Sequence, residues 1–300
     1  MRLIKSIRSF LSDPVMRINY LAILGFYRGV SDEKYLKKLF RAAMQRELNL
    51  KNPRTFNEKI QWLKINSRRP VYTTMVDKYK VKKFVSEKIG EEYVIPLLGV
   101  WNKFDDIDFS QLPERFVLKC THNSGALVIC HDKEKLNLKE MRKMFNKCLK
   151  NNYYWRSREW PYKNVKPRII AEEYVEDSKT AELRDYKFYC FHGECKVYYI
   201  TSGRKNHDLR IDFYDMEWKH MDVRKGCPNA DIPPEKPENF NKMKKIAEFF
   251  AEGIPFIRVD FYEVDGRVYF GEFTFSPWGG LKPFEPEKWD DIFGSWISLH

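Results

Sequence analysis

Four side chains capable of chemistry lie in one hydrophobic stretch near the end of the chain, RVDFYEVDGRVYFGEFTF, residues 258–275. They are Arg258, Asp260, Glu272 and Thr274. Because side chains alternate across a strand, Arg258 and Asp260 share one face, and so do Glu272 and Thr274. Two carboxylates within an apolar sheet need a nearby cation. This predicts a site for Mg²⁺, which takes carboxylate oxygens together with nucleotide phosphates.

The turn of this hairpin decides whether the two pairs share a face. A strict two-residue turn at Asp265-Gly266 sends Glu272 to the face opposite Asp260. A three-residue loop, Val264-Asp265-Gly266, or a bulge near it brings the pairs together and sets Arg258 opposite Glu272. We expect such a loop or bulge, with the charged groups facing one cleft. The alternative is an ion pair between Arg258 and Glu272 with Asp260 at the sheet surface.

Two further segments have the chemistry to bind a nucleotide. FVLKCTHNSGAL, residues 116–127, predicts a strand, a small polar loop and a second strand. Backbone amides of such a loop can surround phosphate oxygens, with Lys119 as a point charge, although an ordinary hairpin turn explains the loop as well. In RIIAEEYVED, residues 168–177, an exposed backbone segment could hydrogen-bond to an adenine edge. The alternative there is a pair of acids on a solvent edge.

The elements that position these residues follow from local patterns. TFNEKIQWLKIN begins with Thr55 and Glu58 at the spacing of a capping box, and a further helix is predicted over residues 71–89. Helices are also predicted at NLKEMRKMFNKCLKNN and PENFNKMKKIAEFFAEG. The predicted strands are YVIPLLGVW, RFVLKC, ALVIC, RIIAEEYV, DYKFYCF, ECKVYYI and the hairpin. A helical first third is therefore followed by a mixed α+β body.

Composition restricts the class of protein. The 300 residues are 43% hydrophobic and 32% charged, which allows a large core and excludes disorder. The six cysteines contain no CxxC pair, so neither a zinc ribbon nor a disulfide scaffold is indicated, and reduced thiols in a cytoplasm are expected. The longest apolar run near the start is far shorter than the ~20 residues of a membrane span.

The net charge of +12 is concentrated near the N-terminus. Residues 1–90 hold 21 Lys and Arg against 7 Asp and Glu, which leaves 33 against 35 for the rest of the chain. Such a field attracts an anionic polymer, nucleic acid or an anionic membrane leaflet. A solvated helical surface explains the same charges.

The order of the motifs resembles the ATP-grasp superfamily, and in detail the chain resembles the TupA-like ATP-grasp family, which is associated with teichuronopeptide and capsular polysaccharide synthesis. The resemblance begins at LNLKNPRTFNEKIQWLKIN and continues through VDKYKVKKFVSEKIGEEYVIPLLGVW, LPERFVLKCTHNSG, EWPYKNVKPRIIAEEYVED, ELRDYKFYCFHG and the hairpin. It implies an α+β fold of two lobes that hold ATP between antiparallel sheets. The expected division is an unassigned basic segment at 1–30, a mainly helical region at 31–110 and an ATP-grasp domain at 111–300.

The resemblance also implies a role for each candidate residue. The nucleotide would be bound by Lys119, His122, Asn123, Ser124, Gly125, Glu172, Val175, Asp185 and Lys187. Among these, Lys119 would meet phosphate, Glu172 and Val175 would lie at the adenine hinge, Asp185 would approach the ribose, and Lys187 would be a second phosphate contact or a surface lysine. Magnesium would be bound by Asp260, Glu272 and Thr274, and the substrate by Ser276, Gly279 and Gly280. Arg258 would meet the transferred phosphoryl group. Thr274 stands where many ATP-grasp enzymes have asparagine, and its hydroxyl is a weaker ligand.

The activity implied by the resemblance is that of a carboxylate–amine ligase that uses ATP and Mg²⁺ and works through an acylphosphate. The expected substrates are an anionic glycan or uronic-acid-containing precursor and an amino acid, with the protein in the cytoplasm and in contact with the inner face of an anionic membrane. A nucleotide-sugar glycosyltransferase is the first alternative, although no DxD-like metal motif is present. A basic nucleic-acid-binding module is the second, but it gives no reason for Asp260 and Glu272, so no nucleic acid is expected.

Overall fold

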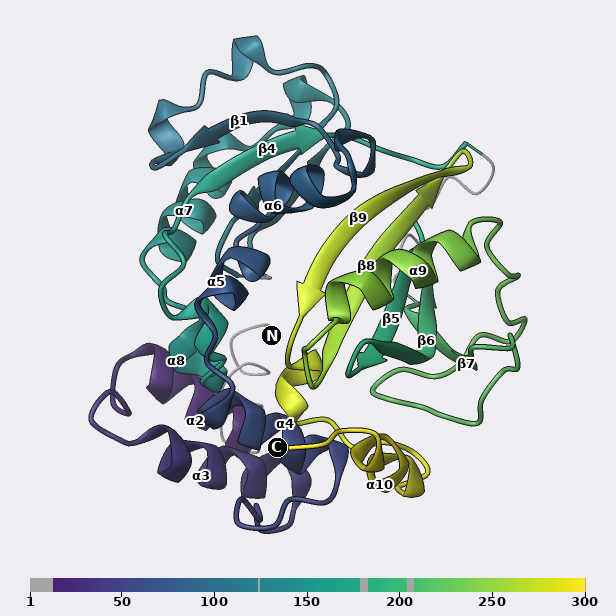
Figure 1. Cartoon of the computed structure of the whole chain (residues 1–300). Helices are drawn as coiled ribbons and strands as arrows, with labels where there is room; N and C mark the ends of the chain where they lie inside the picture. Colours follow the sequence, from purple (N-terminus) through teal and green to yellow (C-terminus); the bar gives the residue numbers. More distant parts are fainter. Residues whose placement is uncertain (1–12, 124, 179–182, 204–207, 300) are drawn as a thin grey trace.

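The computed structural model describes residues 13–123, 125–178, 183–203 and 208–299 (Figure 1). Its described part contains two antiparallel sheets, with helices packed on and between them and a group of helices from the first 70 residues below both. The class is α+β, as the sequence predicts. No helix in these ranges is long and apolar enough to cross a membrane.

The first sheet has the strand order β1-β4-β2-β3, and all its pairings are antiparallel. Its strands are β1 Leu97–Trp101, β2 Phe116–Cys120, β3 Leu127–Cys130 and β4 Ile169–Glu173. Helix α7, Leu138–Leu149, packs Met141 and Phe145 against Phe116 and Leu118 of β2. The strand that carries Lys119 is therefore fixed from one side by α7.

The second sheet has the order β7-β6-β5-β8-β9 and is also antiparallel throughout. Its strands are β5 Asp185–Phe191, β6 Glu194–Ser202, β7 Arg210–Asp215, β8 Ile257–Val264 and β9 Arg267–Thr274. The sequence patterns predict all the strands of both sheets except β7. The turn between β5 and β6 has φ values of 51° at His192 and 90° at Gly193, as a tight hairpin turn requires.

The two faces of the second sheet are covered by different helices. Helix α9, Phe240–Ala251, packs on the face that carries Phe188 and Val259. The opposite face buries the aromatic residues Tyr189, Tyr199 and Phe213 against α4, Phe56–Asn66, and α10, Lys288–Ser295. Arg258 and Lys187 belong to this second face by strand parity, so charged side chains continue a face that is otherwise aromatic.

The N-terminal helices form a small core of their own. Helices α2, Pro14–Ile23, and α3, Asp32–Met44, bury Ile18, Leu36 and Phe40 together. Helix α4 begins with the capping box that the sequence predicts, since Thr55 accepts from Glu58 N and Glu58 accepts from Thr55 N. The other short helical segments are α8 Tyr154–Ser157, η1 Glu91–Tyr93, η2 Phe104–Asp106, η3 Phe109–Gln111, η4 Lys133–Lys135, η5 Trp160–Tyr162 and η6 Pro277–Gly280.

The single helix predicted over residues 71–89 is wrong, because two helices occupy this range. Helix α5, Pro70–Val76, ends before Asp77, and α6 is Lys80–Ile89. The Asp77 carboxylate accepts hydrogen bonds from the amides of Tyr79 and Lys80, so it competes with helix continuation. The break leaves Lys78 in the turn between the two helices, and the Lys78 backbone amide donates to Thr121 O at 3.1 Å.

Candidate active site

The hairpin of β8 and β9 turns through two residues, Asp265 and Gly266, with φ values of 48° and 76°. Val264 pairs directly with Arg267. Two residues with positive φ define the tight turn that matches the twist of paired strands. The expected three-residue loop or bulge close to the turn is therefore wrong.

Glu272 nevertheless shares a face with Asp260, because β9 carries a bulge farther from the turn. Asp260 pairs with Glu272, whereas Phe261 pairs with Phe270, so Gly271 is the extra residue. A Cβ at Gly271 would lie 3.1 Å from the Asp260 carbonyl oxygen. Glycine thus permits the close approach, and the bulge returns the carboxylate of Glu272 to the required side.

Arg258 joins the two carboxylates. Its Nε and Nη2 donate to Asp260 Oδ1 and Oδ2, both at 2.6 Å, and Nη2 also donates to Glu272 Oε1 at 2.9 Å. The predicted common face of the three side chains is confirmed. Asp260 is fully buried rather than at the sheet surface. The register sets Arg258 opposite Thr274, not opposite Glu272 as predicted, so its contact with Glu272 is diagonal.

Lys187 extends this network from the neighbouring strand. It pairs with Asp260 across β5 and β8, and its ammonium contacts the Asp260 carboxylate and donates to Asp185 Oδ1 at 3.1 Å. Thr201 Oγ1 donates to the other oxygen of Asp185 at 3.1 Å. Lys187 is thus buried and not a surface lysine, and it lies on the same side as Asp185, as strand parity predicts.

The carboxylates on this face fit the donor set of Mg²⁺, which prefers oxygen ligands. Burial raises the pKa of Asp260 despite Arg258. Burial would also raise the pKa of Glu272, but Lys78 and Arg258 together lower it to about 2. Glu272 is therefore ionised at neutral pH, and 38% of its side chain is exposed. Thr274 Oγ1 donates to Glu272 Oε1 at 3.3 Å and lies next to the same group.

A cluster of lysines lies on the opposite side of Glu272. Lys119 of β2 forms an ion pair with Glu172 of β4, and Lys82 Nζ lies 2.8 Å from Glu172 Oε1. Burial raises the pKa of Glu172, but Lys119 and Lys82 outweigh it and lower the pKa. Both lysines line a narrow pocket together with Glu172 and Glu272. The Glu172 carboxylate therefore neutralises Lys119 and Lys82. Val175, the other residue expected at the adenine hinge, follows β4 and is half-buried.

Lys78 was not among the predicted site residues, although it lies at the centre of this region. Its ammonium donates to Asn123 O at 2.9 Å, in the predicted phosphate loop. Burial lowers its pKa, and the charge of Glu272 opposes that shift. Lys78 thus connects the loop to the hairpin. The signal that could have found it is Asp77, whose capping tendency ends the first helix and releases the lysine.

The other predicted loop residues are placed as follows. His122 is buried, and its Nε2 lies 3.1 Å from Cys148 O, so the ring contacts α7. Asn123 Oδ1 accepts from Gly125 N at 3.2 Å, which closes a short turn. Ser124 lies outside the described residues. The loop therefore contacts the site through its backbone, where Asn123 O accepts from Lys78, and not through the His122 ring.

A cavity of about 570 Å³ opens on the Arg258 side of Glu272. Its lining includes Lys187, Arg258, Glu272, Thr274, Ser276 and Gly279 from the second sheet and the segment after it. Tyr153, Arg156, Glu159 and Tyr162 contribute from the segment around α8, and Val15 and Asn19 contribute from α2. Part of the N-terminal segment that the sequence left unassigned therefore forms a wall of the cavity.

Glu159 is a second residue that the sequence analysis did not single out. It is buried and accepts a hydrogen bond from Ser157 Oγ at 2.6 Å. Burial raises its pKa, and Lys64 opposes the shift. Its side chain lines the same cavity as Glu272 and Arg258. No spacing motif in the sequence marks this acid, because the fold alone brings it to the cavity.

The glycines after β9 are held by α4 rather than exposed as amide donors. Gly279 N donates to Ser276 O at 2.8 Å, so this amide is already paired and does not face a substrate as a free donor. The carbonyls of Gly279 and Gly280 accept from Gln61 Nε2 at 3.0 and 2.7 Å, and Gly279 O also accepts from Lys64 Nζ at 2.6 Å. Segment η6 is thus fixed against α4, which positions the cavity wall.

Replacing Gly280 with alanine should destabilise the fold. A Cβ there would lie 2.5 Å from Gln61 Nε2 and 2.6 Å from Ile60 Cγ2, and φ is 62°. Overpacking and the left-handed backbone together should cost about 2–4 kcal/mol. Gly253→Ala is the matched control, since φ is 66° but no atom lies within 4 Å, and about 1–2 kcal/mol is expected. Urea unfolding measures both, and equal losses would contradict the packing argument.

The two antiparallel sheets with a lysine-lined pocket on one side and a carboxylate hairpin on the other define an ATP-grasp fold. The TupA-like ATP-grasp family model matches residues 58–298. The chain therefore belongs to this family. Residues 31–110 contain helices α3 to α6 and also strand β1, which pairs with β4 in the first sheet. The domain boundaries stay a prediction.

Comparison with solved structures gives distant likenesses only. D-alanine–D-alanine ligase from Helicobacter pylori is 12% identical, with 81% of this chain and 69% of that chain covered and a TM-score of 0.43. The Bacillus anthracis enzyme complexed with ATP is 18% identical over 67% of this chain and 55% of that chain, with a TM-score of 0.40. This chain thus spans little more than half of that enzyme. No curated protein matches the sequence significantly.

Proposed function

We propose that the protein is an ATP-dependent carboxylate–amine ligase that works through an acylphosphate. The observation that carries this proposal is the common face of Arg258, Asp260 and Glu272, with Lys187 beside them, at the border of a cavity of about 570 Å³. Membership in an ATP-grasp family supports the same general activity. The geometry offers cations for phosphates, carboxylates for a metal and space for two substrates.

The residues divide into two sets around Glu272. Lys78, Lys119 and Lys82 on one side would contact nucleotide phosphates. Their pocket has a free volume of only about 20 Å³, so the two sheets would have to separate before adenine could lie against its apolar lining of Val94, Ile95 and Phe270. Asp260 and Glu272 would hold Mg²⁺, with Thr274 as a weaker ligand. When bound, the metal would neutralise phosphate charge. Arg258 and Lys187 both donate to Asp260 Oδ2, whereas Oδ1 accepts only from Arg258 Nε, which leaves an acceptor position on Oδ1 for a metal ion.

The chemistry then requires no protein nucleophile. A substrate carboxylate oxygen attacks the γ-phosphorus and the bond to ADP breaks, while Arg258 stabilises charge on the transferred phosphoryl group. An amine nitrogen next attacks the acyl carbon, phosphate leaves, and the nitrogen loses a proton. Glu159 lines the same cavity, and burial raises its pKa, so it is our candidate for the base that takes a proton from the ammonium form of the amine.

The mouth of the cavity favours an anionic sugar as the carboxylate substrate. Arg156 and Lys282 are exposed there, and Tyr153 and Trp278 also line the cavity. Cations attract a uronate, and aromatic faces pack against sugar rings. We therefore assign the acceptor to uronic-acid-containing glycans or their precursors and the donor to an amino acid. Cytoplasmic location and contact with an anionic membrane belong to the same proposal, supported by the basic N-terminal third.

The test is a screen for nucleotide release. Purified protein is incubated with ATP, Mg²⁺, a panel of amino acids and a panel of uronates, and ADP is measured against UDP released from nucleotide-sugar donors. The proposal predicts ADP release that needs both an amine and a uronate. Release of UDP without ATP would favour the glycosyltransferase alternative instead.

Lys119→Ala should weaken ATP binding. Loss of one charge-assisted contact to phosphate costs about 1.5–3 kcal/mol, which corresponds to roughly a 10–100-fold rise in Kd. Lys83→Ala on α6 is the control, since the Lys83 side chain is 82% exposed and its ammonium lies 3.6 Å from Glu87 Oε1. Calorimetric titration with ATP measures both variants. Equal affinity in Lys119→Ala and the wild type would remove Lys119 from the nucleotide site.

A further inference from the structure

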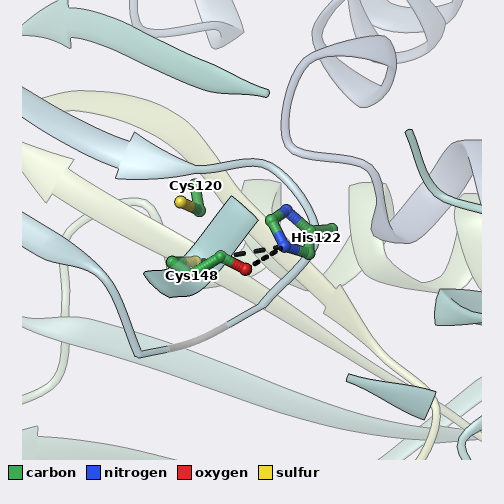
Figure 2. A group of neighbouring side chains, drawn as sticks. All are labelled: Cys120, His122 and Cys148. Carbon is green, nitrogen blue, oxygen red and sulfur yellow. Dashed lines mark hydrogen bonds between the residues drawn. The ribbon is translucent and has the colours of Figure 1, made fainter. Parts of the chain in front are cut away.

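Three side chains of the types that ligate metal ions meet at the base of the loop after β2, two from residues 120–122 and one from α7. Cys120 is the last residue of β2, His122 follows in the loop, and Cys148 lies near the end of α7. Figure 2 shows their side chains gathered in one place, with the His122 ring directed at Cys148. All three residues are buried, at 0%, 2% and 7% exposure respectively.

The distances between the ligand atoms fit one metal ion. The Sγ atoms and one imidazole nitrogen all lie within 4.8 Å of one another, and His122 Nε2 is 4.0 Å from Cys148 Sγ. In a tetrahedral zinc site with bonds of about 2.3 Å to sulfur and 2.0–2.1 Å to nitrogen, ligand atoms lie roughly 3.5–3.8 Å apart. A small inward movement of the three side chains therefore suffices.

Neighbouring groups support this arrangement. Asn123 Nδ2 donates to Cys148 Sγ at 2.5 Å, which would orient and stabilise a thiolate there. His122 Nδ1 is buried without a hydrogen-bond partner among the described residues. The ring can therefore carry its proton on Nδ1 and present the lone pair of Nε2 to a cation without losing an existing Nδ1 contact, although Nε2 must release Cys148 O.

Packing in the core explains buried cysteines, but it does not explain a histidine buried against two of them. Cysteine is a small, often buried residue, and Cys130 at the other end of the same sheet fills space with only a weak contact to Glu114 O. An imidazole buried against two thiols is different, because its ring nitrogens need partners. Nitrogen and sulfur donors select zinc-class ions over Mg²⁺, which prefers oxygen.

We propose that Cys120, His122 and Cys148 form a binding site for a zinc-class divalent cation. Each cysteine would release its thiol proton on binding, so two protons leave for every ion bound. The ion would join the end of β2, the loop at residues 121–123 and α7 into one unit. This site is separate from the carboxylates of the hairpin and does not depend on the proposed ligase activity.

Metal uptake by the reduced full-length protein tests the proposal. Protein freed of metal and kept reduced is titrated with Co²⁺, and thiolate-to-cobalt absorption is followed, with bound zinc measured separately by elemental analysis. About one ion per chain should bind, and Cys120→Ser, Cys148→Ser and His122→Gln should each lose it. Asn123→Ala should retain the stoichiometry with about 10–100-fold weaker affinity.

Control variants identify the site. Cys130→Ser and Cys190→Ser should bind metal as the wild type does, since Cys190 lies in the other sheet with its Sγ 2.8 Å from Cys195 Sγ. Circular dichroism shows whether each variant is folded, and any one folded ligand variant is sufficient for the comparison. Absence of uptake by the wild type, or uptake unchanged in a folded ligand variant, would overturn the site. A disulfide between Cys120 and Cys148 in place of metal binding would do the same.

Discussion

Glu272→Gln should preserve the fold and abolish Mg²⁺-dependent ADP release. Glutamine keeps the volume of the side chain but loses the charge that Lys78, Arg258 and Lys119 hold ionised. Removal of a metal ligand should lower kcat/KM at least about 100-fold, because even outer-shell changes at metal sites cost 10–100-fold. Steady-state kinetics at several Mg²⁺ concentrations measure the loss.

Activity and stability measured together show whether Glu272 is a metal ligand or only a structural charge. Glu272 is 38% exposed and Arg258 keeps both contacts with Asp260, so unfolding free energy should change by only about 1 kcal/mol. Glu194→Gln on the exposed part of β6 is the matched control, with expected activity close to wild type. ADP release by Glu272→Gln at the wild-type rate would exclude the proposed metal site and, with it, this ligase mechanism.

The β8–β9 hairpin shows which features of a strand pair the alternation of side chains can predict and which it cannot. Alternation alone correctly predicts that Arg258 lies beside Asp260 and that Glu272 lies beside Thr274. It does not fix the register between the strands, because a single extra residue moves every following side chain to the other face. Gly271 supplied the missing signal, since an isolated glycine within a strand is typical of a bulge. The turn itself followed the simplest prediction for Asp-Gly.

The parts of the site that the sequence did not predict depend on long-range contacts. Lys78 reaches Asn123, 45 residues away, and Glu159 becomes a cavity acid only where α8 meets the second sheet. The Cys120, His122 and Cys148 cluster has no short-range spacing motif, because Cys148 arrives from α7. Local sequence patterns located the strands of both sheets except β7, whereas the partner of each side chain, such as Glu172 for Lys119, required the packed structure.

Arg258→Lys should lower kcat strongly while ATP binding remains nearly unchanged. Arg258 holds Asp260 through two parallel hydrogen bonds and reaches Glu272 and Tyr199 Oη with its remaining donors. Lysine retains one charge but is shorter in reach and cannot reproduce the planar fork. Arginines that stabilise a transferring phosphoryl group contribute about 10³–10⁵-fold to kcat, so even with the charge kept a loss of at least about 100-fold is expected.

The measurements for Arg258→Lys distinguish transition-state stabilisation from a structural role. Arg267→Lys, at the exposed start of β9, is the control on the same hairpin and should keep kcat within about twofold, as exposed charges do. If Arg258 acts on the phosphoryl group, kcat falls, the Kd for ATP changes little, and thermal unfolding stays cooperative. A variant with normal kcat but weaker ATP binding would show that Arg258 only binds the nucleotide. An interaction that stabilises the bound substrate and the transition state equally changes KM and leaves kcat unchanged.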